Sequence, residues 1–331
     1  MKKTVSFSKH SINVFFHILT NCNLKCRHCY INKEQHGENQ LSIETIETWL
    51  GAFAEKSDRA NVIFLGGEPT LHPDLAPAIK KAKAIGYKSI TVDTNGYLFH
   101  NILSKVGHDI VDYFSFSLDG ATRQTNDMLR GKGSYDKCIA GIKEAVSKNF
   151  TTSLIYTVSS ANIHELHMME PLLEDLGIDR FFIQVIGIRG KSAGNSSPGS
   201  QVSRSQWLTV IPKVAEKVAG HGIIVTYPKV FLSPEEKFEC AGLVAENYFI
   251  FPNGRVYRCP LCEDFPLHSM EFKNNNLIYT DRINESDLFE LNIPEGCVMN
   301  RIIQPANLSY NSNGAPDYKI ACCLLKEEIR I

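Results

Sequence analysis

The sequence lacks an excess of charge of either sign. Its 35 Lys and Arg residues balance 36 Asp and Glu residues, which leaves a formal net charge of −1 over 331 residues. Proteins that bind nucleic acids or anionic lipids concentrate basic residues on one face. The composition therefore gives no support to a nucleic-acid partner or a membrane partner, and it argues against an RNA-modifying enzyme.

Long apolar runs are also missing. About 20 consecutive apolar residues are needed to span a bilayer, and no run approaches that length. Lys2 and Lys3, ahead of the apolar residues 12–19, loosely mimic a signal peptide. The stretch is short, contains His17 and has no small-residue cleavage site. We interpret it as a buried first strand and expect a cytoplasmic protein.

A disulfide framework is not indicated, because such frameworks belong to small secreted chains. The ten cysteines of this chain are instead most simply explained by metal binding. Cys22, Cys26 and Cys29 lie close together in the run CNLKCRHCY. Three thiolates suit three irons of a [4Fe–4S] cube, whereas the usual cluster takes four cysteines. One iron is then left open to a substrate or cofactor, which is typical of a catalytic site.

Zinc is the alternative occupant of the three-cysteine run. A zinc ion would need a fourth nearby ligand, and His28 or His17 are the candidates. Cys138, by contrast, falls within an expected helix and is interpreted as a core residue.

Short apolar runs alternate with amphipathic helical segments along the first two thirds of the chain. The expected strands are residues 13–19, 62–65, 89–92, 113–118, 153–158 and 181–186. The expected helices are residues 43–55, 75–85, 102–108, 135–148 and 163–176. This alternation requires right-handed crossovers and a parallel sheet. Six units are too few for an eight-stranded barrel, so the pattern leaves an open twisted sheet and a partial barrel as alternatives.

The composition changes after the sixth expected strand. Residues 189–204 are rich in Gly and Ser and predict a mobile loop, and residues 206–219 predict a last helix. From about Pro228 the alternation stops, and six cysteines follow. We therefore expect one domain over residues 1–227 and a small cysteine-rich domain over residues 228–331.

Three motifs together carry a family resemblance. The cysteine run, GGEP at residues 66–69 and SLDG at residues 117–120 resemble the signature of the radical S-adenosylmethionine (radical SAM) enzymes, with His28 in a position often held by an aromatic residue. The resemblance spans about residues 12–190. It implies a partial (β/α)6 TIM-like barrel in which Cys22, Cys26 and Cys29 hold a [4Fe–4S] cluster and S-adenosylmethionine binds the open iron.

The resemblance also implies how the cofactor is held. GGEP would bind the amine of S-adenosylmethionine, polar groups at strand ends would contact its ribose or carboxylate, and an arginine suits its carboxylate. The cofactor-binding candidates are Gly66, Gly67, Glu68, Asn95, Ser117, Arg130 and His28. Each candidate also has a purely structural interpretation. GGEP could be a plain turn, Asn95 and Ser117 could cap turns, and Arg130 could be an exposed charge on a loop.

The C-terminal cysteines resemble the auxiliary-cluster regions of the same family, called SPASM or Twitch domains. Gly254 lies between Cys240 and Cys259, and the distances along the chain between these three residues match that pattern. In the pattern the glycine marks a hairpin turn. The remaining run of a full SPASM domain is missing, so we expect one auxiliary [4Fe–4S] cluster. Its other ligands would come from Cys262, Cys297, Cys322 and Cys323. A three-ligand cluster that binds substrate and a zinc knuckle are the alternatives.

A radical SAM enzyme with one auxiliary cluster is the expected function, an oxidoreductase or maturase. Such an enzyme cleaves S-adenosylmethionine reductively to a 5′-deoxyadenosyl radical, which abstracts a substrate hydrogen. The resemblance implies an electron donor such as flavodoxin or ferredoxin, and an auxiliary cluster that accepts an electron or anchors the substrate. The expected substrate is a peptide or protein of the RiPP type, although few residues precede the first strand and we expect no fused recognition domain there.

Two other functions stay open. A radical dehydrogenase or synthase acting on a small metabolite is the enzymatic alternative. A non-catalytic iron–sulfur electron-transfer protein is the alternative from a different class, and it would need neither GGEP nor SLDG.

Overall fold

A 13-stranded sheet forms the frame of the protein. This computed structural model describes residues 1–5, 7, 10–193 and 200–331. Eight neighbouring strands of the sheet are parallel, in the order β8-β7-β6-β5-β4-β3-β2-β10. Their bounds are β2 Ile12–His17, β3 Ala60–Leu65, β4 Ser89–Thr94, β5 Tyr113–Ser117, β6 Thr152–Val158, β7 Arg180–Val185, β8 Ile224–Pro228 and β10 Glu246–Ile250.

Side chains alternate between the two faces of these strands, as the period of two requires. On β5, Phe114 and Phe116 are fully buried, whereas Tyr113 and Ser115 border an internal cavity. On β4, Asp93 borders the same cavity. The outward side of the sheet is therefore apolar, and the inward side is partly polar around an open centre.

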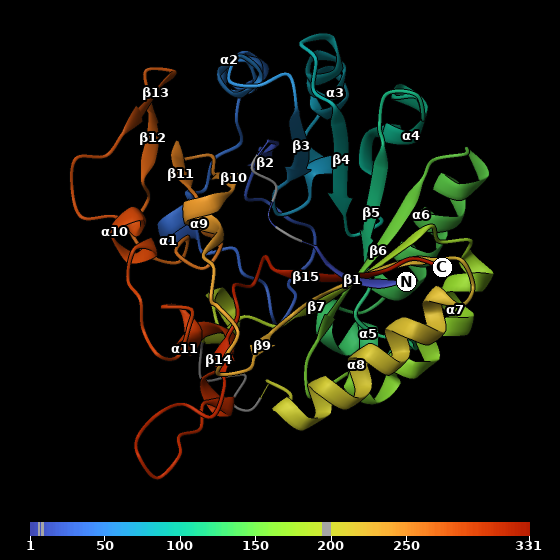
Figure 1. The fold of residues 1–331 in the computed structure, drawn as a ribbon. Coiled ribbons are helices and arrows are strands. Elements are labelled where there is room, and N and C mark those ends of the chain that lie inside the picture. Colours follow the sequence, from blue (N-terminus) through green and yellow to red (C-terminus); the bar gives the residue numbers. More distant parts are fainter. Residues whose placement is uncertain (6, 8–9, 194–199) are drawn as a thin grey trace.

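Helices cover the outer side of the curved sheet (Figure 1). The longer ones are α2 Ile43–Ala54, α3 Leu75–Ala84, α5 Arg123–Arg130, α6 Ser134–Ser147, α7 Met169–Leu176 and α8 Arg204–Ala219. The shorter ones are α1 Lys33–His36, α4 Ile102–Lys105, α9 Ala241–Val244, α10 Glu285–Phe289 and α11 Asn300–Ile303, with 3-10 turns η1 Pro69–Leu71, η2 Phe99–Asn101, η3 Ile163–Met168, η4 Gly190–Ala193 and η5 Pro305–Asn307. Ser42 begins α2 by accepting a hydrogen bond from the Thr45 amide (3.2 Å), as its position before an apolar period predicts.

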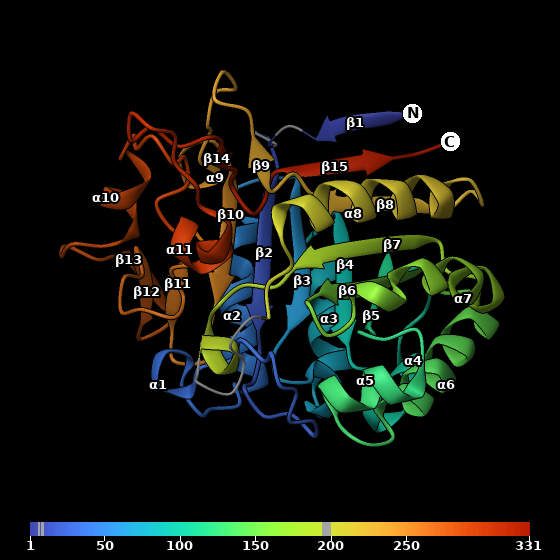
Figure 2. The ribbon, with the colours of Figure 1, turned by 90° about the horizontal axis from the view of Figure 1, so that it is seen from below.

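Segments from the last third of the chain extend both edges of the parallel strands. β10 pairs with β2 on one edge and continues into an antiparallel series, while β15 pairs with β8 on the other. β1 then pairs with β15, which brings the two termini side by side (Figures 1 and 2). The added strands are β1 Lys2–Val5, β11 Arg255–Tyr257, β12 Met270–Lys273, β13 Asn276–Tyr279 and β15 Lys326–Ile329, and a separate pair is formed by β9 Phe231–Leu232 and β14 Lys319–Ile320.

The predicted partial barrel with a cysteine-rich C-terminal region is confirmed. All six predicted strands are present as β2 to β7, with ends displaced by at most two residues. β8 adds a seventh strand after α8, and hydrogen bonds among the described strands leave the sheet open. α5 is a helix that the sequence pattern missed.

Two predictions on domain organisation are left untested. The predicted domain boundary between residues 227 and 228 stays a prediction. Strands that follow this boundary pair with both edges of the sheet that precedes it, so the two parts share one sheet. Within the predicted loop 189–204, residues 194–199 lie outside the described part of the structure, and η4 precedes them.

Across the described residues, the search for a helix with the length and apolarity of a membrane span finds none.

The outward aromatic residues of β5 should be important for stability. Phe114 is fully buried and lies edge-on to Phe150 with ring centroids 5.0 Å apart. Truncation of a buried Phe to Ala typically costs about 3–5 kcal/mol. We expect Phe114→Ala to lower the free energy of unfolding by that amount in urea denaturation, while the exposed Met128→Ala changes it little. Equal effects of the two variants would contradict this assignment of the core.

Candidate functional site

One cavity at the carboxyl ends of the parallel strands gathers the residues singled out in the first half of the sequence. It has a volume of about 860 Å³. Its lining includes all ten predicted residues: Cys22, Cys26, Cys29, His28, Gly66, Gly67, Glu68, Asn95, Ser117 and Arg130. They come from the loop after β2, from the ends of β3, β4 and β5, and from the end of α5. The carboxyl ends of barrel strands are where such folds carry their chemistry.

The glycines of GGEP hold the start of the cysteine loop. The Gly67 amide donates to Leu19 O (3.1 Å) and the Glu68 amide donates to Asn21 O (3.0 Å). A Cβ at Gly67 would lie 2.2 Å from the Asn21 carbonyl oxygen. Only glycine allows this close approach, so GGEP positions the backbone just before Cys22.

The Glu68 carboxylate joins two segments beside the cavity, the turn after β3 and the end of β4. It is almost fully buried, and its Oε1 accepts from the Thr70 amide (3.1 Å), the Thr70 hydroxyl (2.6 Å) and the Thr94 hydroxyl (2.8 Å). Its Oε2 accepts from the Asn95 amide (2.7 Å). Burial raises the pKa of Glu68, and these four donors oppose that rise. The carboxylate thus fixes the ends of β3 and β4, and its predicted contact with an amine stays a prediction.

Asp119 is a buried linking residue beside the cavity that the sequence motifs did not reveal. Its fully buried carboxylate accepts from Arg130 Nε (2.5 Å), pairs with His28 Nε2 (3.0 Å) and accepts from the Thr157 amide (2.7 Å). Burial by itself would raise the pKa of Asp119. Arg130, His28 and the Thr157 amide outweigh burial and hold the pKa well below its usual range. The available signal was the acid within SLDG, directly after a strand.

Asp119 therefore links the cysteine loop to α5 and β6. The loop gains two more contacts with the end of α5, because the Arg27 amide donates to Leu129 O (2.9 Å) and the Cys26 thiol donates to Arg130 O (3.8 Å). Arg130 is buried at this junction, so its interpretation as an exposed loop charge is wrong.

The histidines near the cysteine run are engaged elsewhere. Both ring nitrogens of His17 have partners, Ile250 O (3.0 Å) and the Tyr30 hydroxyl (2.8 Å), and burial lowers the pKa of His17 to about 3. Among the described residues, no three His, Cys, Asp or Glu side chains lie close enough together to hold a single metal ion. His17 therefore has no free ring nitrogen to offer as the fourth ligand that zinc would need at the run.

The thiols of the run line a partly polar cavity, and Cys22 is exposed whereas Cys26 and Cys29 are half-buried. Partial loss of solvation raises the pKa of Cys22 to about 12 and also raises the pKa of Cys26. Metal-bound cysteines are thiolates, so binding of a cluster here would have to displace protons. Cys22, Cys26 and Cys29 would suit a cluster held by three thiolates, since they line one cavity together with polar side chains.

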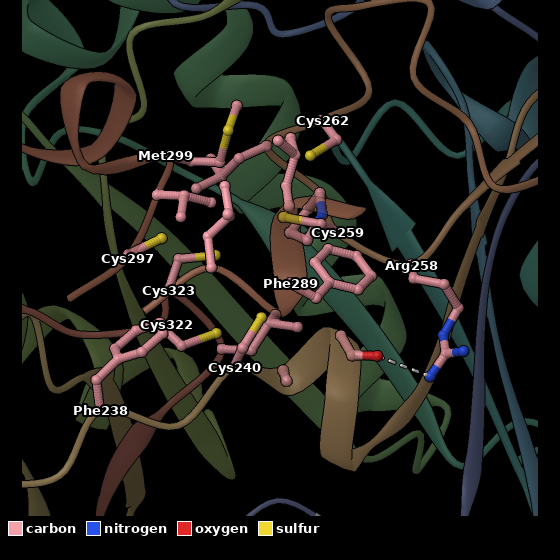
Figure 3. Close-up of a pocket in the computed structure, with 18 residues that line it drawn as sticks. Phe238, Cys240, Arg258, Cys259, Cys262, Phe289, Cys297, Met299, Cys322 and Cys323 are labelled. Atoms are coloured by element: carbon pink, nitrogen blue, oxygen red, sulfur yellow. Dashed lines mark hydrogen bonds between the residues drawn. The ribbon is translucent and has the colours of Figure 1, made fainter. Parts of the chain in front are cut away.

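The six C-terminal cysteines line a second cavity. Figure 3 shows their sulfur atoms turned toward a common space, whose volume is about 470 Å³. The six are Cys240, Cys259, Cys262, Cys297, Cys322 and Cys323. Cys240 precedes α9, Cys259 follows β11 and Cys322 precedes β15, so segments attached to both edges of the parallel sheet contribute. The predicted hairpin is confirmed, since β10 pairs with β11 and Gly254 has φ +87°.

The thiols of this cavity influence one another. Burial raises the pKa of Cys297 well above its usual range, and the neighbouring thiols of Cys259, Cys322 and Cys240 add to the rise. Burial also raises the pKa of Cys240 to about 11, with Cys322 adding to it. Four thiols from four separate segments therefore lie near one another.

Glu285 positions one of these segments, and the sequence reasoning missed it. Its fully buried carboxylate accepts from the Arg258 amide (2.6 Å), the Cys259 amide (2.9 Å) and the Ser269 hydroxyl (2.8 Å). Glu285 lies on α10, far along the chain from Cys259, and no motif joins the two.

Comparisons with known proteins agree with this geometry. Residues 17–172 match the family model described as the Radical SAM superfamily. The chain is 31% identical over 196 residues to Fe-coproporphyrin III synthase of Methanosarcina barkeri, an alignment that covers 58% of this chain and 48% of the relative. It is 28% identical over 219 residues to pre-heme d1 synthase of Dinoroseobacter shibae, which covers 63% of this chain and 52% of the relative. The chain thus spans about half the length of these curated relatives.

A solved structure of similar fold covers more of the chain. The crystal structure of Streptococcus suis SuiB bound to precursor peptide SuiA aligns with a TM-score of 0.68 at 14% identity. The alignment covers 89% of this chain and 71% of SuiB. At this identity the likeness establishes a shared fold.

Asp119 offers a direct test of the first cavity. Asp119→Asn leaves the buried Arg130 guanidinium without its counter-charge, and removal of one partner of a buried ion pair costs about 3–5 kcal/mol. We expect this variant to lower the free energy of unfolding by about 3 kcal/mol in urea denaturation. Asp136→Asn is the matched control, because the Asp136–Arg123 pair is exposed. If both variants unfolded at the same urea concentration, the linking role of Asp119 would be refuted.

Proposed function

Because residues 17–172 belong to the radical SAM superfamily, we propose that the chain is an enzyme that reductively cleaves S-adenosylmethionine and modifies a peptide or protein. The superfamily uses a [4Fe–4S] cluster with S-adenosylmethionine, and the first cavity would hold both. The observation that carries the proposal is the convergence of ten residues from five separate segments on one cavity. A cluster bound there would supply the electron for reductive cleavage of S-adenosylmethionine.

The chain's own residues would bind and orient the cofactor. Cys22, Cys26 and Cys29 would hold the cluster, and the GGEP backbone would accept from the cofactor amine. In the described contacts Asp119 engages only the Nε of Arg130, which leaves its terminal N–H groups available to a carboxylate. The fixed ends of β3 and β4 keep these groups in place before the cofactor arrives.

We propose that Cys240, Cys259, Cys297 and Cys322 hold one auxiliary [4Fe–4S] cluster. A four-iron cluster usually takes four cysteines, and the thiol of Cys297 neighbours the other three. Cys262 lines the same cavity but is not among the thiols that raise the pKa of Cys297. It belongs to an apolar cluster with Phe249, Phe251 and Tyr257, against which Cys259 also packs. The auxiliary cluster would accept an electron from the substrate or anchor it, and a flavodoxin or ferredoxin would reduce the first cluster. Such clusters require reducing conditions, which supports the cytoplasm as the compartment.

A peptide substrate is supported by the fold shared with SuiB over 89% of this chain, since SuiB was solved with a precursor peptide. The second candidate is a synthase acting on a small metabolite. It is supported by the relatives of higher identity, which are named Fe-coproporphyrin III synthase and pre-heme d1 synthase. Both candidates share the same cofactor site.

The cofactor site is tested by anaerobic reconstitution with iron and sulfide, followed by dithionite and S-adenosylmethionine. The wild-type protein should contain about eight irons per chain and form 5′-deoxyadenosine. The triple variant Cys22→Ala, Cys26→Ala, Cys29→Ala should retain about four irons and form none. A fully loaded wild-type protein that forms no 5′-deoxyadenosine would refute the enzyme proposal.

Single serine variants test the auxiliary site. Cys259→Ser and Cys297→Ser should lower the iron content from about eight to about four per chain, because each removes one of four ligands. Cys323→Ser, next to the proposed ligand Cys322, is the matched control and should retain about eight. Full iron in Cys297→Ser, or a loss in Cys323→Ser equal to that in Cys259→Ser, would overturn this ligand set.

A further inference from the structure

A third cavity fills the centre of the open barrel below the cofactor site. Its volume is about 750 Å³. It shares three lining residues with the first cavity, Asp93, Ile155 and Gln184, so the two spaces meet. Those three residues lie on β4, β6 and β7. A molecule in the barrel would therefore have one end next to the cofactor site, with Asp93 beside that end.

Most of this cavity is neutral. Its apolar wall includes Phe15, Ile63, Phe181 and Phe182, and its hydroxyl groups come from Thr91, Tyr113, Ser115, Ser153 and Thr226. Its charged residues among the described part of the chain are Asp93 and Arg180. Arg180 already faces Glu328 (3.6 Å) and lies over the Tyr113 ring, 5.1 Å from its centroid.

Asp93 has no cationic partner in the described ion pairs. Its partner is Ser115, a neutral hydroxyl directly opposite on β5. Burial raises the pKa of Asp93 to about 7, the nearby Glu68 adds to that rise, and Ser115 opposes it. A buried carboxylate is costly unless a cation or several donors compensate its charge. The chain supplies one hydroxyl, so a cation carried by a bound molecule would favour the ionised form of Asp93 over the protonated form.

We propose that the barrel cavity binds the substrate through a cationic nitrogen group, an amine or a guanidine, held by Asp93. The apolar wall of the cavity would take the carbon chain that carries this group. The inference rests on the proposed function, because the cavity opens to the cofactor site. It makes Asp93 a substrate-binding residue that selects a basic group close to the reacting atoms.

Matched small probes test this without knowledge of the substrate. n-Pentylamine and n-pentanol have the same carbon chain and differ in charge. We expect the cluster-loaded wild-type protein to bind n-pentylamine at least about tenfold more tightly than n-pentanol, a difference of about 1.4 kcal/mol. Saturation-transfer NMR titrations measure both affinities.

Three variants test whether Asp93 causes the preference for the amine. Asp93→Asn keeps the shape of the side chain and should bind the two probes about equally. Ser115→Ala keeps the carboxylate and should retain the preference for the amine, as should Asp136→Asn on the surface. Equal binding of the two probes by the wild-type protein, or an amine preference that survives Asp93→Asn, would overturn the proposal. Circular dichroism verifies that each variant is folded.

The outcome is separable from that of the proposed function. Formation of 5′-deoxyadenosine by the wild-type protein reports on the cofactor site alone, whereas probe binding reports on the barrel cavity. Cofactor cleavage without an amine preference would refute only the role of Asp93.

Discussion

The parallel strands of this protein stop short of a closed barrel, which leaves β2 and β8 with main-chain groups to satisfy on one side. An unpaired edge strand is open to non-native pairing, and proteins cover such edges. Here the C-terminal third covers both, since β10 pairs with β2 and β15 pairs with β8. The segments that carry Cys240, Cys259 and Cys322 adjoin these added strands, so the second cavity is built from the elements that cover the open barrel.

The same open sheet explains the first cavity. Because the carboxyl ends of parallel strands meet on one side, short loops bring distant motifs together there. Two buried carboxylates then fix the loops to one another. Glu68 joins the ends of β3 and β4, and Asp119 joins the cysteine loop to α5 and β6. The inward, partly polar side of the strands leaves the barrel cavity, which Asp93 borders.

Much of this could be predicted from the sequence, because the signals involved are local. Short apolar runs alternating with helical segments predicted β2 to β7, and the spacing of Cys22, Cys26 and Cys29 predicted the cluster site. α5 was missed because its sequence RQTNDMLR is polar and has little apolar periodicity. The roles of Asp119 and Glu285 depend on contacts with residues far along the chain, which no local pattern encodes. The position of Asp93 opposite Ser115 likewise depends on the pairing of two strands.

We propose that Cys22, Cys26 and Cys29 hold a cluster with an open iron that takes S-adenosylmethionine. Electron paramagnetic resonance of the dithionite-reduced, fully loaded protein tests this proposal. S-adenosylmethionine should change the signal of one cluster and leave the auxiliary signal unchanged. The change should be lost in the triple variant Cys22→Ala, Cys26→Ala, Cys29→Ala. A spectrum that does not respond to S-adenosylmethionine, or a response that survives in that variant, would contradict the account.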